Sequence, residues 1–328
     1  MKALVTGATG FIGSHIAREL LKSGASVRVL VRKGSDRRNL AGVDVEIVEG
    51  NILDRASISS ALKTCDTLFH AAADYRLWTK NPAAMYAANV EGTENVLEAA
   101  HSAGIGKVVY TSSVGTLGNP GDGTPGDEDT PVSFTDMVGD YKKSKFLAER
   151  KAESFLARGL QLVIVNPSTP VGPFDIKPTP TGKIIVDFVS RRMPAYLETG
   201  LNLIAVEDCA RGHIMAAEKG RTGEKYILGN ENLMLDEIFE MLSRISGIPK
   251  PRFCLPYGPI LVAAWLNEAF SAVTGREPMI PLSGVRMAKK LMFFSPKKAR
   301  MELGFETTPV YDALERAVEW FRANGYLK

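Results

Sequence analysis

The stretch Lys2-Ala-Leu-Val-Thr-Gly-Ala-Thr-Gly-Phe-Ile-Gly13 decides the fold of this chain. Its apolar start suits a buried strand, Gly7, Gly10 and Gly13 follow at three-residue spacing, and the apolar pattern over 11–21 predicts a helix. A strand that enters a helix through such a turn is an anion site, because backbone N–H groups and the helix dipole face the ligand and glycine lets a pyrophosphate come close. The stretch therefore predicts a dinucleotide-binding fold.

Composition limits the classes of protein to which the chain can belong. Its 328 residues are 45% hydrophobic, which is enough for one large α/β domain and a smaller one. The net charge of +3 does not imply a nucleic-acid partner. Cys65, Cys209 and Cys254 lie far apart, so we expect neither a disulfide framework nor a metal site, and we expect a reducing, cytoplasmic compartment. The first residues predict a strand and a turn rather than a signal peptide.

The apolar runs of the chain are short. None reaches the roughly 18 residues that a transmembrane helix needs. The nearest candidate begins at Ile260 and continues to Val273, interrupted by Asn267 and Glu268. We interpret it as a buried helix of the second domain. Contact of residues 257–273 with a membrane surface or a partner protein stays open as the alternative.

Strand and helix patterns alternate through the first 166 residues. After the first strand, strands are predicted at 26–31, 45–49, 67–72, 107–111 and 161–166, and helices at 56–63, 81–103 and 140–158. The alternation predicts an α/β protein with a Rossmann-type, doubly wound parallel sheet. Residues 167–173 and 178–181 are irregular and rich in proline. Beyond them a helix at 206–219 and a strand at 225–228 precede a smaller, mainly helical C-terminal substrate domain, with helices at 235–246, 260–273, 283–291, 296–303 and 310–324.

The end of the second strand carries positive charge. In dinucleotide folds an acid at this end binds the free 2′-hydroxyl of NAD, whereas an arginine suits the 2′-phosphate of NADP. No Asp or Glu occupies positions 30–33; Arg32 and Lys33 stand there, and Arg37 and Arg38 add charge nearby. The pattern favours NADP(H), with NAD(H) as the second choice. A solvated basic loop is the alternative.

Two features follow the fourth strand. The alanine run 71–73 suits the close passage of a ligand or of another backbone segment, and tight packing alone explains it equally well. The loop after it carries Tyr75, Arg76 and Trp78. An arginine between aromatic residues, at the carboxyl edge of a parallel sheet, suits a substrate-facing loop. A surface loop with a packed tryptophan is the alternative.

Tyr141 and Lys145 are spaced i, i+4 and share one face of a predicted helix. A free tyrosine titrates near pH 10 and is a poor acid or base at neutral pH, but a neighbouring ammonium, together with an oxidised nicotinamide, favours the phenolate and lowers the pKa. Ser113, at the tip of the preceding strand, can donate a hydrogen bond to a substrate oxygen. The three would move a proton while the nicotinamide moves a hydride. We interpret the four histidines as structural.

Together these motifs make the chain resemble the extended short-chain dehydrogenase/reductases, the NAD-dependent epimerase/dehydratase family, over essentially its full length. The motifs are T-G-A-T-G-F-I-G at 6–13, G-N-I-L-D at 50–54, H-A-A-A at 70–73, N-V-E-G-T at 89–93, Y-T-S-S at 110–113, Y-K-K-S-K at 141–145 and N-P-S-T-P-V-G-P at 166–173. Stretches such as A-D-Y-R-L-W at 73–78 are similar to the hopanoid-associated sugar epimerase group, which neighbours the dihydroflavonol reductases.

The resemblance implies roles for individual residues. Ser113, Tyr141 and Lys145 would form the catalytic triad, with Lys145 also holding the nicotinamide ribose. The family usually has Asp at position 51, where Asn51 can still accept a hydrogen bond from adenine. With Arg32 from the charge pattern, the expected cofactor-binding residues are Gly7, Thr9, Gly10, Phe11, Ile12, Gly13, Arg32, Asn51, Ile52, Ala71, Ala72, Ala73, Tyr141, Lys145, Pro167, Ser168 and Thr169.

The resemblance also implies an organisation of the chain. Residues 1–174 and 206–232 would form the NADP-binding Rossmann domain, and residues 175–205 and 233–328 the substrate-binding domain. A homodimer formed by the packing of two helices is common among such proteins and is expected here. The remaining partner would be a small-molecule substrate.

Departures from the subgroups of the family narrow the reaction. Nucleotide-sugar 4,6-dehydratases place an Asp-Glu pair where this chain has Val114 and Gly115, and sugar-nucleotide 4-epimerases usually carry tyrosine and asparagine where it has Leu117 and Thr169. We therefore expect an NADP(H)-dependent oxidoreductase acting at a ketone or secondary alcohol of a sugar- or polyol-like substrate, in hopanoid lipid modification. A sugar epimerase with tightly bound NAD(P) and a non-catalytic dinucleotide sensor are the alternatives.

Overall fold

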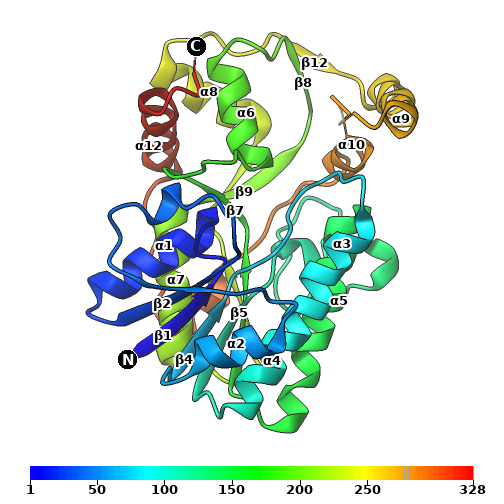
Figure 1. The fold of residues 1–328 in the computed structure, drawn as a ribbon. Coiled ribbons are helices and arrows are strands. Elements are labelled where there is room, and N and C mark those ends of the chain that lie inside the picture. Colours follow the sequence, from blue (N-terminus) through cyan, green and yellow to red (C-terminus); the bar gives the residue numbers. More distant parts are fainter. Residues whose placement is uncertain (277, 280, 328) are drawn as a thin grey trace.

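The computed structural model describes residues 1–327 except 277 and 280. A parallel sheet with the order β3-β2-β1-β4-β5-β6-β10 lies at its centre, which confirms the predicted Rossmann-type fold (Figure 1). The order reverses between β1 and β4, and ligands of such sheets bind at the carboxyl ends at this point. The strands are β1 (Lys2–Thr6), β2 (Ser26–Val31), β3 (Glu46–Glu49), β4 (Thr67–His70), β5 (Lys107–Thr111), β6 (Leu162–Pro167) and β10 (Lys225–Leu228).

Helices cover both faces of this sheet because its strands are apolar on both sides. In β1, Ala3 and Val5 belong to the core on one face and Leu4 to the core on the other, as the two-residue period of a strand requires. One face carries α1 (Phe11–Lys22), α7 (Val206–Lys219) and α11 (Lys297–Leu303). The other carries α2 (Arg55–Leu62), α4 (Gly92–Ser102) and α5 (Gly139–Ser154).

The helix predicted over 81–103 is a continuous segment in three parts. It consists of α3 (Pro82–Tyr86), a π-helical turn (Ala87–Glu91) and α4. Short 3₁₀ turns complete this part of the chain at Arg38–Leu40, Val114–Thr116, Phe134–Asp136 and Leu156–Arg158.

A second layer lies beyond the carboxyl ends of the central strands (Figure 1). It has a three-stranded sheet with the order β11-β9-β7, a strand pair β12-β8, and a core formed mainly by α6, α8 and α12. The helix pair α9 and α10 lies at its side. The elements are β7 (Thr169–Val171), α6 (Pro180–Val189), β8 (Ala195–Leu197), β9 (Gly200–Ala205), β11 (Glu231–Met234), α8 (Leu235–Ser246), β12 (Phe253–Leu255), α9 (Tyr257–Thr274), α10 (Leu282–Ala288) and α12 (Val310–Ala323).

Three sequence expectations for this layer were wrong in detail. The irregular run at 178–181 contains the start of α6, because Pro180 stands in the first turn and Thr179 caps it by accepting from the amide of Gly182 at 3.1 Å. The chain after 231 also contains β11 and β12, which are too short to show a clear alternation. The helix expected to be buried, α9, is covered on one face only.

The division into a nucleotide-binding and a substrate-binding domain stays a prediction. Within the predicted substrate part, α11 packs on α7, and Ala299 and Leu303 belong to the core of the central sheet. The remaining helices of that part pack mostly among themselves. Within the part of the chain that the structure describes, no helix could span a membrane.

Candidate active site

The glycine turn after β1 is shaped by contacts that exclude any side chain. Gly7 has a φ of +77°, and a Cβ there would lie 2.6 Å from the amide nitrogen of Ala72. A Cβ on Gly13 would lie 2.3 Å from the carbonyl oxygen of Gly7. The turn therefore packs against the alanine run and against its own helix, which supports the tight-packing interpretation of that run.

The same turn leaves a helix terminus available to an anion. Gly10 is the N-cap of α1 and supplies no side-chain cap, and the first turn contains no acidic residue. The N–H groups at Phe11 and Ile12 lie in this first turn, at the positive end of the helix dipole. These features fit the pyrophosphate of a dinucleotide.

Asn39 supports the turn, and sequence reasoning missed it. It is fully buried, and its Nδ2 donates to the carbonyl oxygens of Thr9 at 3.3 Å and Gly10 at 3.5 Å. Arg18 donates to the carbonyl of Asn39 at 2.8 Å. An asparagine in a polar loop gives no sequence signal for this role, because the contacts join segments about 30 residues apart.

A hollow of about 350 Å³ opens beside the glycine turn. Arg32, Lys33 and Lys177 bring positive charge to it. Arg37 and Arg38, which the sequence suggested as further charge, instead pair with Glu49 and Asp36. The other lining residues are Thr9, Gly10, Phe11, Gly34, Ser35, Asp36, Tyr75, Asp175 and Ile176.

Asp175 adds a carboxyl group to the lining of this basic hollow, and it was not among the residues expected in the site. One oxygen accepts from the amide and the hydroxyl of Thr179, at 2.8 and 2.9 Å, and the other is buried without a partner in the described chain. Burial raises the pKa of Asp175 to about 7. At neutral pH the group is therefore partly protonated, which reduces its repulsion of a phosphate.

Asn51 and Ile52 are the residues that the sequence predicts beside adenine, and local contacts hold both in place. The Oδ1 of Asn51 accepts from the amide of Leu53 at 3.1 Å, and its carbonyl accepts from the hydroxyl of Ser57 at 3.1 Å. Ile52 packs at the edge of the core beneath α4. Contact of Asn51 and Ile52 with adenine stays a prediction.

The predicted triad lies at the carboxyl end of β5 and on the first turns of α5. Ser113 follows β5, and its Oγ accepts from the amide of Gly115 at 3.0 Å. The side chain of Ser113 also forms a hydrogen bond with the hydroxyl of Tyr141. Lys145 is buried, and its Nζ donates to the carbonyl of Thr111 at 2.8 Å and to the hydroxyl of Tyr110 at 3.0 Å. The fold therefore brings the three residues together.

The protein residues alone do not lower the pKa of Tyr141, and the lowering expected together with an oxidised nicotinamide stays a prediction. Desolvation raises the pKa of Tyr141, although the hydrogen bond with Ser113 acts to lower it. Burial lowers the pKa of Lys145 to about 7, and the carboxylate of Glu149 acts in the opposite direction. The expected lowering of the Tyr141 pKa is thus not a property of the residues alone, because removal from water outweighs their hydrogen bonds.

Asn89 connects α5, which carries Tyr141 and Lys145, to the loop after β4 that was predicted to face the substrate. It lies in the π-helical turn, and its Nδ2 donates to Ser144 Oγ and to the carbonyl of Asp74, both at 2.9 Å. Its Oδ1 accepts from the amide of Asp74 at 2.7 Å. The sequence motif at 89–93 contained this residue without indicating its role.

The tentative substrate residues lie on the loop that Asn89 holds. The hydroxyl of Tyr75 donates to the carbonyl of Lys177 at 3.1 Å, and its ring lines the hollow beside the glycine turn. Arg76 pairs with Asp74 through Nε at 2.9 Å. Trp78 is half-buried. A substrate role for Tyr75, Arg76 and Trp78 stays a prediction, and Tyr75 lies on the side of the glycine turn.

The segment after β6 offers an unpaired hydroxyl to a ligand. Pro167 ends β6 and Thr169 begins β7, and the amide of Ser168 donates to Leu228 at 2.9 Å. The Oγ of Ser168 is buried and has no hydrogen-bond partner within the described chain. A buried hydroxyl without a partner is unusual, and a bound carboxamide would supply one.

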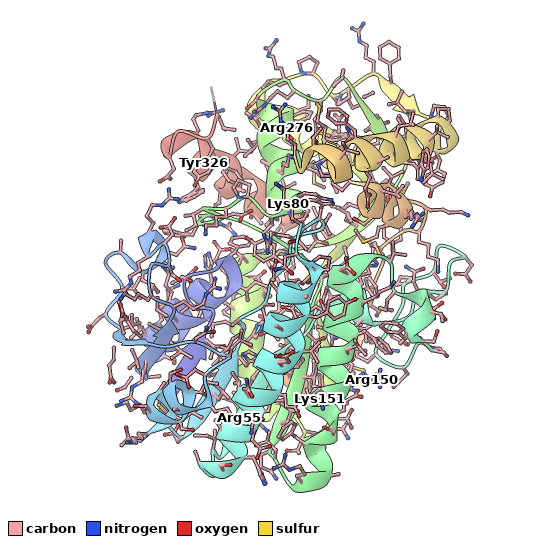
Figure 2. The ribbon with its side chains drawn as sticks, turned by 45° about the vertical axis from the view of Figure 1, so that its right-hand side comes forward. Arg55, Lys80, Arg150, Lys151, Arg276 and Tyr326 are labelled. Carbon is pink, nitrogen blue, oxygen red and sulfur yellow. The ribbon has the colours of Figure 1, made fainter. Side chains whose placement is uncertain are left out.

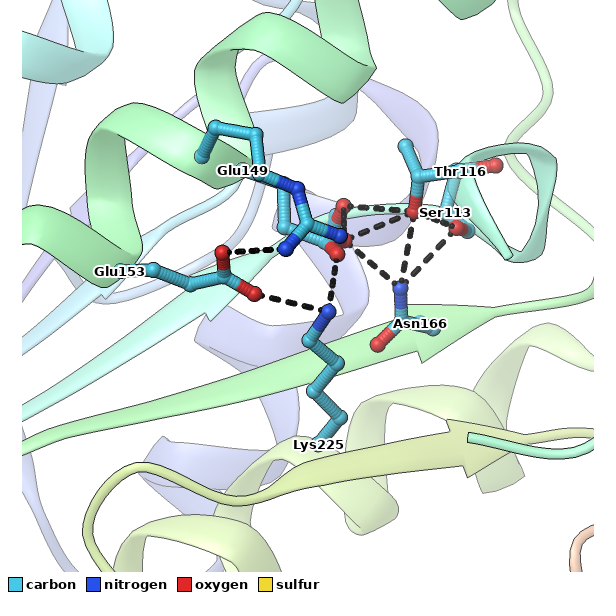
Figure 3. Close-up of polar contacts among 8 residues, drawn as sticks. Ser113, Thr116, Glu149, Glu153, Asn166 and Lys225 are labelled. Atoms are coloured by element: carbon cyan, nitrogen blue, oxygen red, sulfur yellow. Dashed lines mark hydrogen bonds and ion pairs between the residues drawn. The ribbon is translucent and has the colours of Figure 1, made fainter. Parts of the chain in front are cut away.

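A buried polar network lies directly behind Ser113 (Figure 3). Glu149 is fully buried and accepts from Thr116 Oγ1 at 2.7 Å, from Asn166 Nδ2 at 3.0 Å and from Lys225 Nζ at 2.7 Å. Asn166 Nδ2 also donates to the carbonyl of Ser113 at 3.0 Å. Thr116 Oγ1 lies 2.7 Å from the same carbonyl, so its single hydrogen can serve either Ser113 or Glu149. Burial alone would raise the pKa of Glu149, but Lys225 and the hydrogen bonds hold it below its usual value.

Glu149→Gln is expected to destabilise the protein by about 3 kcal/mol, because a neutral amide would leave the charge of Lys225 poorly compensated and turn an N–H group toward it. Glu153 pairs with the same Lys225 at 2.8 Å but is partly exposed, so Glu153→Gln should cost less than about 1 kcal/mol. Urea unfolding of the two variants measures both. Equal losses would contradict a special role for the buried carboxylate.

Three buried histidines predict a loss of stability in acid. Burial lowers the pKa of His70 to about 3 and those of His15 and His213 to about 4. The unfolded chain binds these protons near pH 6.5, so their contribution is complete above that value and falls toward pH 4, by about 1.4 kcal/mol per pH unit for each. Urea unfolding measures the free energy of unfolding between pH 7.5 and 5. This free energy should fall less steeply with decreasing pH in His213→Asn than in the control His101→Asn. An unchanged slope in His213→Asn would contradict the assignment.

The parallel sheet, the uncapped glycine turn and the Ser-Tyr-Lys constellation define a dinucleotide-dependent enzyme. The family model for the NAD dependent epimerase/dehydratase family matches residues 3–229. The chain therefore belongs to that family, whose members include reductases, epimerases and dehydratases of the extended short-chain dehydrogenase/reductase type.

Individual similar proteins cover the whole chain. A Synechocystis protein with the provisional name dihydroflavonol 4-reductase is 45% identical over 99% of this chain and 95% of its own. Sterol demethylase protein B of Methylococcus capsulatus is 33% identical over 100% of both chains. The protein in the crystal structure of gox2253 is 49% identical in sequence to this chain. The match covers 99% of both chains, and the two structures superpose with a TM-score of 0.90.

Proposed function

We propose that this enzyme is an NADP(H)-dependent oxidoreductase that acts at a ketone or a secondary alcohol. The observation that carries the cofactor choice is Arg32, which lines the hollow beside the glycine turn with Lys33 and Lys177. Among the residues that the structure describes, Arg37 and Arg38 have carboxylate partners, whereas no ion pair is formed by Arg32. A 2′-phosphate would therefore meet an available guanidinium.

The residues fit such a cofactor at each of its parts. Gly7 and Gly13 leave no side chain in the turn, and Gly10 leaves the helix terminus uncapped for a pyrophosphate. The unpaired Oγ of Ser168 suits the carboxamide. When bound, the cofactor supplies or accepts the hydride.

The proton would be handled by Tyr141. In the direction of reduction its hydroxyl donates a proton to the carbonyl oxygen of the substrate while Ser113 donates a hydrogen bond to the same oxygen. The ammonium of Lys145 stabilises the phenolate that remains. Because the pKa of Lys145 is about 7, activity that requires this ammonium should decline as the pH rises above neutrality.

The substrate class is proposed from the names of two similar proteins. Dihydroflavonols and sterols both carry a reactive oxygen on a ring. The proposed substrate is a sugar- or polyol-like ring compound, in hopanoid lipid modification, as expected from the sequence. The proposed setting is a cytoplasmic homodimer.

A panel of cyclic ketones tests the proposal, with loss of NADPH absorbance as the measurement. Turnover of at least one ketone, faster with NADPH than with NADH, is expected. Turnover with NADH alone would contradict the cofactor choice, and no reduction by either cofactor would contradict the reaction.

A sugar epimerase is the second candidate, because the family that the chain belongs to includes such enzymes. An epimerase returns the hydride to the same substrate and keeps its cofactor bound. Denaturing the purified protein and finding stoichiometric NAD would favour it. The cofactor-sensing alternative is weaker, because Ser113, Tyr141 and Lys145 are all in place.

A further inference from the structure

Helix α9 is apolar on all sides but is covered on only one. Ala264 is fully buried and, with Ile260 and Leu261, packs against Leu282 and Val285 of α10. The opposite face is exposed. Its large side chains and their exposed fractions are Val262 59%, Trp265 59%, Leu266 56%, Phe270 60% and Val273 89%.

The exposed residues follow helical spacing and form one continuous strip along α9. Phe253 and Leu255 on β12, 68% and 36% exposed, extend it at one end, and Met279, 86% exposed, extends it at the other. We call these eight side chains the α9 face. The helix lies at the outer edge of the molecule, and within the described chain the α9 face itself is exposed (Figure 1). An exposed apolar surface of this kind marks an interaction site.

The segment that carries the α9 face is basic. Residues 251–291 contain five basic and two acidic residues, so this one segment accounts for the net charge of +3 of the whole chain. The acid Glu268 is turned toward α10, where it accepts from the amide of Leu282 at 3.2 Å, and Glu277 lies outside the described residues. The basic residues are Arg252, Arg276, Arg286, Lys289 and Lys290.

Further charges lie at the two ends of the helix. Lys80 approaches the C-terminal end of α9 at Gly275, and Arg276 lies at the same end of the helix (Figure 2). At the N-terminal end, Glu198 and Lys289 line one hollow together. All five basic residues of the segment are exposed, so their charges are available to an anionic surface.

We propose that the α9 face lies on the surface of a bilayer that contains anionic phospholipid. The large apolar side chains would enter the boundary between headgroups and acyl chains, and the surrounding Lys and Arg side chains would meet the headgroup phosphates. Because no described helix can span a membrane, the contact is peripheral. An apolar strip on a segment with excess positive charge matches an anionic bilayer, because such a bilayer offers an apolar interior and negatively charged headgroups together.

The position of the α9 face relative to the active site connects membrane docking to access of a lipid substrate. Ser283 of α10 donates to the carbonyl of Leu77 at 3.0 Å, within the loop that carries Tyr75, Arg76 and Trp78. Docking would therefore place that loop close to the membrane, where a lipid substrate is found. This use rests on the proposed function, whereas the docking itself does not.

Vesicle flotation of the full chain tests the docking. The probes are vesicles of phosphatidylcholine alone and vesicles that also contain phosphatidylglycerol. We expect flotation with the anionic vesicles, weaker binding at high salt, and a loss of about fivefold in affinity for each basic residue changed in Arg286→Gln and Lys289→Gln. The double variant Trp265→Ser and Phe270→Ser should lose binding at least tenfold.

The control is Leu147→Ser, which removes an exposed apolar side chain of α5, 37% exposed and outside the α9 face. It should bind the anionic vesicles like the parent protein, and all variants should keep the parent midpoint of urea unfolding, which reports that they are folded. Absence of flotation with anionic vesicles, or flotation that the double variant retains, would overturn the proposal. Ultracentrifugation that shows a dimer of the parent protein and a monomer of the double variant would overturn it too, because a second copy would then cover the α9 face.

Discussion

Tyr141→Phe is expected to lower the rate of hydride transfer by about 10³-fold or more, with NADPH affinity unchanged within about threefold. The phenylalanine ring keeps the shape of the residue and removes only the hydroxyl that exchanges a proton with the substrate. Ser113 cannot replace it, because a serine hydroxyl hydrogen-bonds but does not ionise near neutral pH. The measurement is single-turnover oxidation of bound NADPH with the ketone that the parent protein reduces fastest.

The matched control is Tyr86→Phe, which removes a tyrosine hydroxyl from α3, where it donates to Asp140 at 3.3 Å. This variant should keep at least about half of the parent rate. If Tyr141→Phe retained more than a tenth of that rate, another group would have to supply the proton, and the assignment of the triad would be wrong.

Arg32→Glu is expected to weaken NADPH binding about 100-fold and to strengthen NADH binding, so that the cofactor preference reverses. Arg32 lines the hollow beside the glycine turn, where its guanidinium would pair with a 2′-phosphate. A carboxylate there repels the phosphate and accepts from the free 2′-hydroxyl of NADH. The affinity change corresponds to about 3 kcal/mol.

Arg37→Glu makes the same change of charge five residues away. Arg37 pairs with Glu49 and does not line the hollow, so we expect less than about a threefold effect on NADPH. Equal losses in the two variants would show that only the general positive charge of the loop matters. Fluorescence titration of both cofactors against each variant distinguishes the two cases.

The sequence predicted the parts of the site that depend on local pattern. The glycine spacing predicted the turn because each glycine there avoids a specific clash, and the clash at Gly13 confirms how close the approach is. The i, i+4 spacing of Tyr141 and Lys145 predicted a shared helix face. The alternation of strand and helix patterns along the chain predicted the parallel sheet. In each case neighbouring residues contain the information.

The features that local sequence patterns do not contain depend on the tertiary fold. The pKa of Tyr141 rises because other segments remove its hydroxyl from water, and no local sequence pattern shows this. The network around Glu149 joins α5 to β10, 76 residues away. Helix α9 was interpreted as buried because it is apolar on every side, and only the fold shows which side is left uncovered.

The most direct test of the central claim is fluorescence titration of the purified protein with NADPH and with NADH. If Arg32 binds a 2′-phosphate, NADPH should bind at least about tenfold more tightly than NADH, since a single charged hydrogen bond contributes roughly 1.5 kcal/mol or more. The protein should also release the cofactor on dialysis. Tighter binding of NADH, or stoichiometric NAD that remains bound through purification, would contradict an NADP(H)-dependent oxidoreductase and favour an epimerase.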